Sequence, residues 1–180
     1  MTIQPVNPDT ATGRVAELLS GAKAKLGMVP NMFRVIANAP KVLEGYFAFS
    51  GVVGNTLNGK AREQLAIALA SSNDCGYCLS AHTALGRMAG IGADDLRSAQ
   101  SGTVSDPKTQ AMIDFALEVN RTHGENMQSG VAAARAAGLS DEELLEIIAN
   151  VALNIFTNAV NGVAETEIDF PKVEIIKKAA

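Results

Sequence analysis

Apolar residues along this chain recur with the spacing of amphipathic helices. The first run places five side chains on one helical face, at positions i, i+3, i+4, i+7 and i+11: Val15, Leu18, Leu19, Ala22 and Leu26. The next segment, GMVPNMF, interrupts this pattern because Pro30 disfavours helical geometry at the residue before it. Pro40 suits the first turn of a helix, and the apolar run 42–53 that follows it predicts a second helix.

Two adjacent helices are predicted in the middle of the chain. The segment 60–72, KAREQLAIALASS, is rich in strong helix formers and follows a loop-like GNTLNG stretch. A short break at Asn73 and Asp74 separates it from a further helix, which we expect to end near Gly90 and Gly92.

Helical spacing continues through the rest of the chain. It returns over 106–124, and the segment 140–165 begins with a capping box of Ser140 and Glu143 before a long apolar run. Convincing strands with period-two alternation are missing, so the pattern predicts an all-α bundle. A long apolar helix of this kind can also be buried between subunits, and we therefore expect a homo-oligomer.

Length and composition fit one helical domain over 1–180, with its core motif region at 57–92. Apolar residues make up 47% of the chain, but we expect no apolar stretch to be long enough to span a bilayer, and the first ten residues lack the build of a secretory signal. The net charge is −4 without basic clusters, which argues against nucleic acid or a membrane surface as partner. We expect a cytoplasmic protein, in which reducing conditions disfavour a permanent structural disulfide.

Both cysteines and one of the two histidines crowd into eight positions, at Cys75, Cys78 and His82. Asn73 and Asp74 are preferred N-cap types, so Cys75 is expected in the first helical turn, where the helix dipole lowers a thiol pKa. Cys75 and Cys78 are i and i+3, close enough for a disulfide after small adjustments, and His82 lies one turn beyond Cys78.

A carboxylate belongs to the same group if the two central helices form an antiparallel hairpin. Helical rise then places Glu63 level with His82, where it would orient the imidazole and raise its basicity. The predicted relay runs from Glu63 through His82 to Cys78.

This arrangement predicts thiol redox chemistry. A thiolate attacks the terminal oxygen of a hydroperoxide and becomes a sulfenic acid, the second cysteine closes a disulfide, and an external dithiol restores both thiols. Nearness to His82 favours Cys78 as the attacking thiolate, whereas the helix terminus favours Cys75, so spacing alone leaves the order open.

The pattern of Glu63, eleven residues, CGYC at 75–78, three residues and His82 resembles the signature of alkylhydroperoxidase AhpD-like proteins of the carboxymuconolactone decarboxylase superfamily. The resemblance extends upstream through GMVPNMFRVIANAP and into the C-terminal helix. It implies an AhpD-like all-helical fold, trimers or hexamers, and peroxide reduction with electrons from a lipoylated protein or a similar dihydrolipoamide-like dithiol, without a bound cofactor or metal. It also implies that Cys78 forms the sulfenic acid, that Cys75 resolves it, and that His82 and Glu63 form the relay.

One position departs from that signature. The best-known members carry a histidine immediately before the second cysteine, where this chain has Tyr77. A phenol is a poor base near neutral pH, so the relay here depends on His82 alone. We expect Tyr77 to lie half-buried beside the site, where it either shapes substrate access or simply packs.

Several alternatives remain open at the level of sequence. The cysteines could be two buried apolar residues, or zinc ligands together with His82 and Glu63, although a second ligand pair is missing. The protein could instead be a lyase acting on a small cyclic acid, or a non-enzymatic redox sensor. His123 fits a solvated residue at a helix end, and Met28, Met32 and Phe33 fit either core packing or an apolar approach to the thiols.

A weak internal repeat appears when the chain is shifted by 83 residues, so that 63–78 overlies 146–161. Asn158 and Asn161 then take the places of the two cysteines. We interpret the region 140–167 as a degenerate second copy that lost its thiols, and we expect the two asparagines to close helix ends or face a subunit interface.

Overall fold

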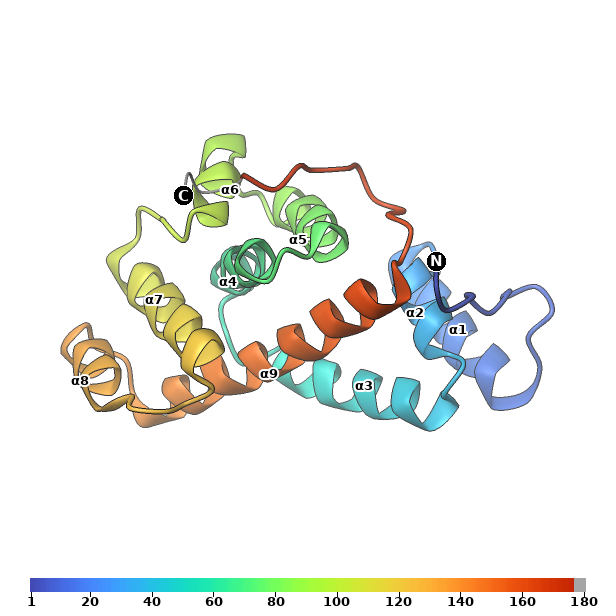
Figure 1. Ribbon diagram of the computed structural model, residues 1–180, viewed down its shortest axis with the longest axis horizontal. Coiled ribbons are helices and arrows are strands. Elements are labelled where there is room, and N and C mark those ends of the chain that lie inside the picture. Colours follow the sequence, from blue (N-terminus) through green and yellow to red (C-terminus); the bar gives the residue numbers. More distant parts are fainter. Residues whose placement is uncertain (177–180) are drawn as a thin grey trace.

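The computed structural model describes residues 1–176, which form nine helices and no strand. The all-α prediction is therefore confirmed, and Figure 1 shows the arrangement of the helices. In chain order they are α1 (Gly13–Leu26), α2 (Asn31–Ile36), α3 (Pro40–Val53), α4 (Gly59–Ser72), α5 (Gly76–Met88), α6 (Ala93–Gln100), α7 (Pro107–Thr122), α8 (Gln128–Ala136) and α9 (Asp141–Ala164).

The three helices that the apolar pattern did not predict are the shortest ones, α2, α6 and α8. They have six, eight and nine residues, which is too few turns for helical spacing to repeat. Helix α2 begins directly after Pro30, so the segment that interrupts the apolar pattern contains the start of a short helix.

Helix α4 lies at the centre of the fold, in contact with α5, α6, α7 and α9. It separates two apolar clusters: Leu65 and Leu69 belong to one, and Ile67 and Ala70 belong to the other. Because side chains on both of its sides are buried, α4 is a fixed support for the residues that it presents to α5.

Helix α9 is the longest helix among the described residues, and it crosses the molecule beside α3, α4 and α7 (Figure 1). The predicted capping box is present, because Ser140 Oγ accepts from the Glu143 amide at 3.1 Å and the Glu143 carboxylate accepts from the Ser140 amide at 2.8 Å. By length and composition alone α9 could cross a membrane, so the expectation that no apolar stretch is long enough was wrong. A buried core helix passes the same test, and 44% of the apolar window of α9 is buried within this fold.

The internal repeat is not confirmed. Residues 63–78 span α4, a break and the start of α5, whereas 146–161 lie within the uninterrupted helix α9.

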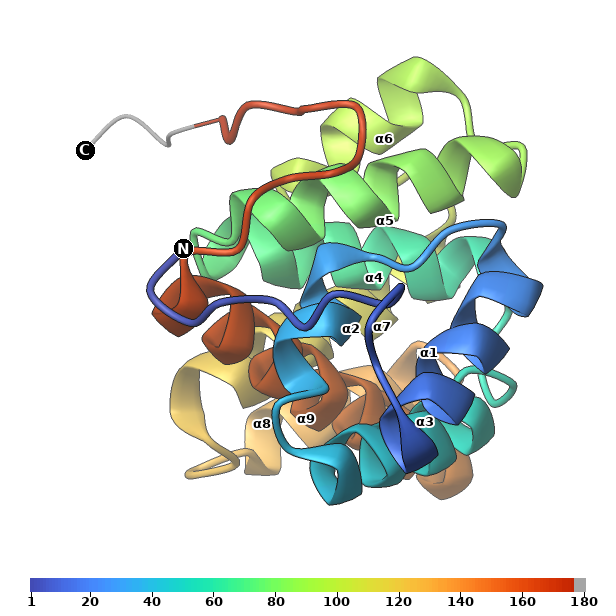
Figure 2. The same ribbon diagram turned by 90° about the vertical axis from the view of Figure 1, so that its right-hand side faces the viewer.

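The segment that follows α9 turns back across α5 towards α6, as the red trace in Figure 2 shows. The Val173 amide donates to Ser80 Oγ on α5 at 3.1 Å, and the Ile176 amide donates to Gln100 Oε1 on α6 at 3.3 Å. Apolar side chains of this segment, including Ile168 and Phe170, pack on the cluster that contains both cysteines. The segment therefore helps to cover the start of α5.

Candidate active site

The turn between α4 and α5 sets the position of the cysteine pair. Asn73 ends α4, Asp74 adopts a left-handed conformation with φ of 54°, and Cys75 is itself the N-cap of α5. The prediction that Cys75 lies inside the first turn was therefore wrong by one residue, because Asp74 tolerates the left-handed turn and shifts the helix start. In this position Cys75 Sγ accepts a hydrogen bond from the Cys78 amide at 3.3 Å.

The two sulfurs lie on the same side of the helix start, with Sγ of Cys75 and Sγ of Cys78 2.7 Å apart. Both thiols are free, and both residues are buried, with exposed fractions of 7% and 3%. The two cysteines are thus a close pair, as their spacing predicts, and the Cys75 thiol donates to the Cys78 sulfur.

Glu63 on α4 lies level with His82 on α5, as the hairpin geometry predicted. Glu63 Oε2 is 2.8 Å from His82 Nδ1, and Glu63 is only 4% exposed. Its other carboxylate oxygen accepts from Arg62 at 3.0 Å and 3.2 Å, and Arg62 also donates to the carbonyl of Gly54. The carboxylate is therefore held from two sides and fixes the imidazole through Nδ1.

The electrostatics of this pair favour a charged state on both partners. Burial alone would raise the pKa of Glu63, but hydrogen bonds and positive charge from His82 and Arg62 outweigh it and lower that pKa. Burial would likewise lower the pKa of His82, but the Glu63 carboxylate and the negative charge on Cys78 raise it. We infer a carboxylate–imidazolium pair beside the sulfur.

The sulfur of Cys78 is surrounded by groups that favour the thiolate. The hydrogen bond from Cys75 lowers the pKa of Cys78 most, burial opposes this, and His82, Asn161 and Asn158 lower the pKa further. For Cys75 the hydrogen bond and negative charge of Cys78, together with burial, raise the pKa. These shifts favour a thiolate on Cys78 and a thiol on Cys75.

Sequence reasoning missed the contribution of α9 to the site. Four buried asparagines follow one another along its inner side, and we call them the asparagine face of α9: Asn150, Asn154, Asn158 and Asn161. Asn161 Nδ2 donates to Cys78 Sγ at 3.3 Å, so its buried side chain points into the site and not to a helix end or a subunit interface. The sequence does contain a signal for this contribution, because the four asparagines are spaced i, i+4, i+8 and i+11 in an apolar helix. Amides on one buried helical face need hydrogen-bond partners, which indicates a polar site beside that face.

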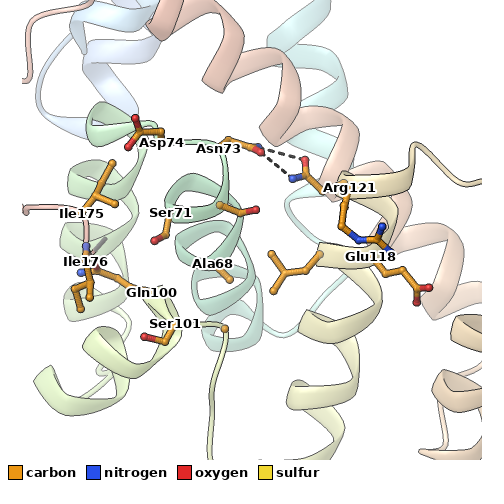
Figure 3. A pocket seen from close by; sticks show the side chains of 14 residues that line it. Ala68, Ser71, Asn73, Asp74, Gln100, Ser101, Glu118, Arg121, Ile175 and Ile176 are labelled. Carbon is orange, nitrogen blue, oxygen red and sulfur yellow. Dashed lines mark hydrogen bonds between the residues drawn. The ribbon is translucent and has the colours of Figure 1, made fainter. Parts of the chain in front are cut away.

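A chain of side-chain amides leads from this face to the molecular surface. Asn158 Oδ1 accepts from Asn73 at 2.8 Å. Asn73 also exchanges two hydrogen bonds with Asn120, at 2.7 Å and 3.2 Å, which are the dashed lines at Asn73 in Figure 3. Asn158 therefore joins the α4–α5 turn to α9 instead of capping a helix. The pocket in Figure 3, about 900 Å³ in volume, is lined by Asn73, but by neither cysteine.

A much smaller cavity of about 80 Å³ is lined by Cys78 and His82. Its walls come from α2, α3, α5 and α9 and are mostly apolar or aromatic: Met32, Tyr46, Tyr77, Cys78, Ala81, His82, Leu153, Asn154 and Thr157. The reactive groups therefore face a narrow space between helices.

Tyr77 lines this cavity, but it is buried and not half-buried as expected. Its hydroxyl oxygen accepts from the Met32 amide at 3.2 Å, and its ring packs edge-on against Phe170. Burial raises the pKa of Tyr77, so the residue stays neutral and forms a wall of the cavity.

The other candidate residues are placed more simply. Met32 lines the cavity, Phe33 packs against the rings of Tyr46 and Phe47, and Met28 is half-buried. His123 is the exposed, left-handed C-cap of α7. Within 1–176 no group of three or more His, Cys, Asp or Glu side chains is placed to hold a metal ion.

An all-helical fold with a buried cysteine pair beside a carboxylate–imidazole pair defines a class of helical dithiol proteins. Residues 40–106 match the model of the carboxymuconolactone decarboxylase family. This match includes the cysteine pair and the glutamate–histidine pair, and the fold of the whole chain is AhpD-like. No curated protein matches the chain.

Three solved structures illustrate the shared fold. One is an uncharacterized peroxidase-related protein from Ralstonia eutropha JMP134, described as an alkylhydroperoxidase AhpD core, with 24% identity and a TM-score of 0.83 over 93% of this chain and 92% of that chain. A peroxidase-related protein from Silicibacter sp. TM1040 has 23% identity and a TM-score of 0.81 over 92% and 91% of the two chains. A variant of the debrominase Bmp8 in complex with 2,3,4-tribromopyrrole has 16% identity and a TM-score of 0.78 over 94% and 92%. At these identities the likeness is one of fold.

Proposed function

We propose that the protein is a thiol-dependent hydroperoxide reductase in which Cys78, Cys75, His82 and Glu63 do the chemistry. The observation that carries this proposal is the Cys78 sulfur, which has a second sulfur 2.7 Å away and an imidazole held by a buried carboxylate on the same cavity. A dithiol of this kind can be oxidised and restored without a bound cofactor or metal.

In the first step the Cys78 thiolate attacks the terminal oxygen of the hydroperoxide. The O–O bond breaks, an S–O bond forms, and the leaving alkoxide takes a proton from the His82 imidazolium to become an alcohol. Glu63 stabilises the imidazolium beforehand and orients it through Nδ1. The sulfur is oxidised to a sulfenic acid, and the peroxide is reduced.

In the second step Cys75 attacks the sulfenic sulfur. While Cys78 is a thiolate, its charge and hydrogen bond keep the pKa of Cys75 raised. Once Cys78 carries a neutral sulfenic acid that charge is gone, so Cys75 loses its proton more readily. Hydroxide leaves the sulfenic sulfur, takes up a proton as water, and a disulfide forms between the two cysteines.

An external dithiol then returns the pair to its reduced state. One thiolate of the reductant attacks the disulfide, and its second thiol closes the reductant's own disulfide, which releases Cys75 and Cys78 as thiols. A dihydrolipoamide-like dithiol, carried on a lipoylated protein or a similar donor, fits this role because it exchanges two electrons without leaving a mixed disulfide. Tyr77 has no role in proton transfer in this scheme, because burial raises its pKa and the phenol keeps its proton.

The test is hydroperoxide consumption with dihydrolipoamide or dithiothreitol as reductant, combined with a count of free thiols. We expect hydroperoxide to consume both thiols and the dithiol to restore them. Cys78→Ser should abolish turnover, whereas Cys75→Ser should accumulate a sulfenic acid that dimedone traps. An unchanged rate for Cys78→Ser would exclude it as the nucleophile.

Two other outcomes would replace this proposal. Lactone decarboxylation by a variant with both cysteines changed to alanine would support a lyase. An oxidation-dependent change in assembly size, without catalytic peroxide consumption, would support a redox sensor.

A further inference from the structure

The cavity at Cys78 contains a polar atom that the relay does not use. Asn154, on the asparagine face of α9, lines this cavity together with Cys78 and His82. It is 5% exposed, and its Oδ1 has no hydrogen-bond partner among the described residues. Buried side-chain acceptors are nearly always paired in folded proteins, so an unpaired one in a reactive cavity points to a ligand.

The orientation of the Asn154 amide follows from its other end. Nδ2 donates to the backbone carbonyl of Asn150, one turn earlier in α9, at 2.9 Å. A carbonyl can only accept, so the NH₂ group must face it. Oδ1 is thereby left as the end of the amide that is free to bind.

Several other polar groups around the cavity have partners within the protein. The Tyr77 hydroxyl oxygen accepts from Met32, the Thr157 hydroxyl donates to the carbonyls of Leu153 and Asn154, and His82 Nδ1 faces Glu63. The groups left for a ligand include the Cys78 sulfur, Nε2 of His82 and Oδ1 of Asn154, and the Tyr46 ring lies in the same wall. A ligand that suits them has an electrophilic atom, a hydrogen-bond acceptor and a hydrogen-bond donor within a few bonds.

We propose, on the basis of the function above, that Asn154 positions a small hydroperoxide by accepting a hydrogen bond from its terminal O–H. The terminal oxygen is the atom that Cys78 attacks, and its proton stays on it as the O–H group passes to sulfur. The inner oxygen, which leaves as alkoxide, is then directed to the proton on His82. Asn154 is thus a substrate-binding residue that distinguishes hydroperoxides from peroxides without an O–H group.

The size of the cavity narrows the substrate class. Its volume of about 80 Å³ is well below the roughly 300–1,000 Å³ of pockets that bind drug-sized ligands. Hydrogen peroxide and short alkyl hydroperoxides fit this space, whereas cumene hydroperoxide, with its aromatic ring, does not. The site is assigned to small hydroperoxides.

The test compares two reactions of Cys78 in single-turnover measurements on the full chain. Oxidation by hydrogen peroxide and by ethyl hydroperoxide requires the Asn154 acceptor, whereas methyl methanethiosulfonate modifies a thiolate without any donor group. For Asn154→Leu we expect both hydroperoxide rates to fall about 10- to 100-fold, as the loss of one hydrogen bond to the substrate predicts. The methyl methanethiosulfonate rate and its pH profile should stay within about twofold of the native protein.

Controls separate this inference from the proposed function. Asn150→Ala removes a buried amide from the same face one turn away and should keep the hydroperoxide rates. If Asn154→Leu does not fold, Asn154→Ala should show the same fall in the hydroperoxide rates. If either Asn154 variant reacts with hydroperoxides as fast as the native protein, the role of Asn154 is overturned and the proposed function stays intact. The same conclusion follows if the methyl methanethiosulfonate rate falls in parallel with the hydroperoxide rates. Cumene hydroperoxide reacting as fast as hydrogen peroxide would overturn the size limit. Failure of the native thiols to react with any hydroperoxide would instead reject the proposed function.

Discussion

The negative charge on Cys78 depends on side chains from three helices. Cys75 and His82 come from the same helix as Cys78, Glu63 acts through His82 from α4, and Asn161 reaches the sulfur from α9. Each interaction lowers the free energy of the thiolate relative to the thiol, so removing any one of them should raise the pKa of Cys78.

Asn161→Leu tests the contribution of α9 to this charge. We expect the pKa of Cys78 to rise and its alkylation by iodoacetamide at pH 6.5 to slow about 10-fold, because a hydrogen bond to an ionised group contributes about 1.5–3 kcal/mol. The measurement is the pH profile of the alkylation rate. Asn150→Ala, on the same face but without contact to the sulfur, should leave the profile in place, and an identical profile for both variants would contradict this role of Asn161.

Glu63→Gln tests the carboxylate–imidazolium pair. In the native protein the lowered pKa of Cys78 and the raised pKa of His82 bound a pH window in which thiolate and imidazolium coexist. Alkylation of Cys78 should therefore persist well below the usual thiol pKa of about 8.5 and decline as the pH falls through the lowered pKa of Cys78.

In Glu63→Gln the pKa of His82 falls, because the carboxylate that raises it is gone, and the imidazolium disappears at a lower pH. The pKa of Cys78 then rises, and the alkylation profile should move to higher pH by about one unit. Single-turnover oxidation near neutral pH should slow by about 10². A profile that stays in place would show that Glu63 only packs.

The helical pattern was sufficient to predict the relay but not the asparagine contacts. Glu63 and His82 belong to consecutive helices, and helical rise alone sets them level with each other. Asn154 and Asn161 lie more than seventy residues beyond His82, and their position depends on which side of α9 packs against α5. The packing of α9 depends on the whole core. The spacing of residues within α9 therefore does not show which side of the helix faces α5.

At the scale of elements, the ends of the helices were harder to predict than the helices themselves. Asn73 and Asp74 are good capping types, yet the left-handed turn at Asp74 gives the cap to Cys75 and brings its sulfur to the Cys78 amide. The start of α9 was predictable, because the side chains of Ser140 and Glu143 each accept a hydrogen bond from the other's backbone amide, and both residues lie in one short stretch of sequence.

Ser140→Ala removes the cap of α9 and should lower the free energy of unfolding by about 1 kcal/mol. Urea denaturation followed by circular dichroism measures the difference, and the slope of the transition should not change. Ser98→Ala, at an exposed position within α6, is the matched control and should change stability by less than about 0.5 kcal/mol. Equal stabilities of the two variants would mean that the capping box adds nothing to α9.

At the scale of the whole molecule, α9 has apolar residues on its outer side as well as on its inner side. Leu145, Ile148 and Val163 are exposed there, together with Ile155 and Phe156, and α3 adds exposed Val42 and Val52. An exposed apolar face of this extent is typical of a contact with another molecule. The apolar run in the sequence predicted a buried helix, but it could not show which residues face the core and which face outwards.

We expect this outer face to be covered by a second copy of the chain, as the homo-oligomer predicted from the sequence requires. Leu145→Glu places a charge at a residue that is 67% exposed, where it has little effect on the fold but opposes burial between subunits. The oligomer should therefore shrink towards a monomer in sedimentation velocity, with an unchanged circular dichroism spectrum. Lys25→Glu, at an exposed position near the end of α1, is the control and should keep the native size. Because Cys78 and its partners all belong to one chain, the monomeric variant should still react with hydrogen peroxide in a single turnover, and loss of that reaction would show that a neighbouring subunit completes the site.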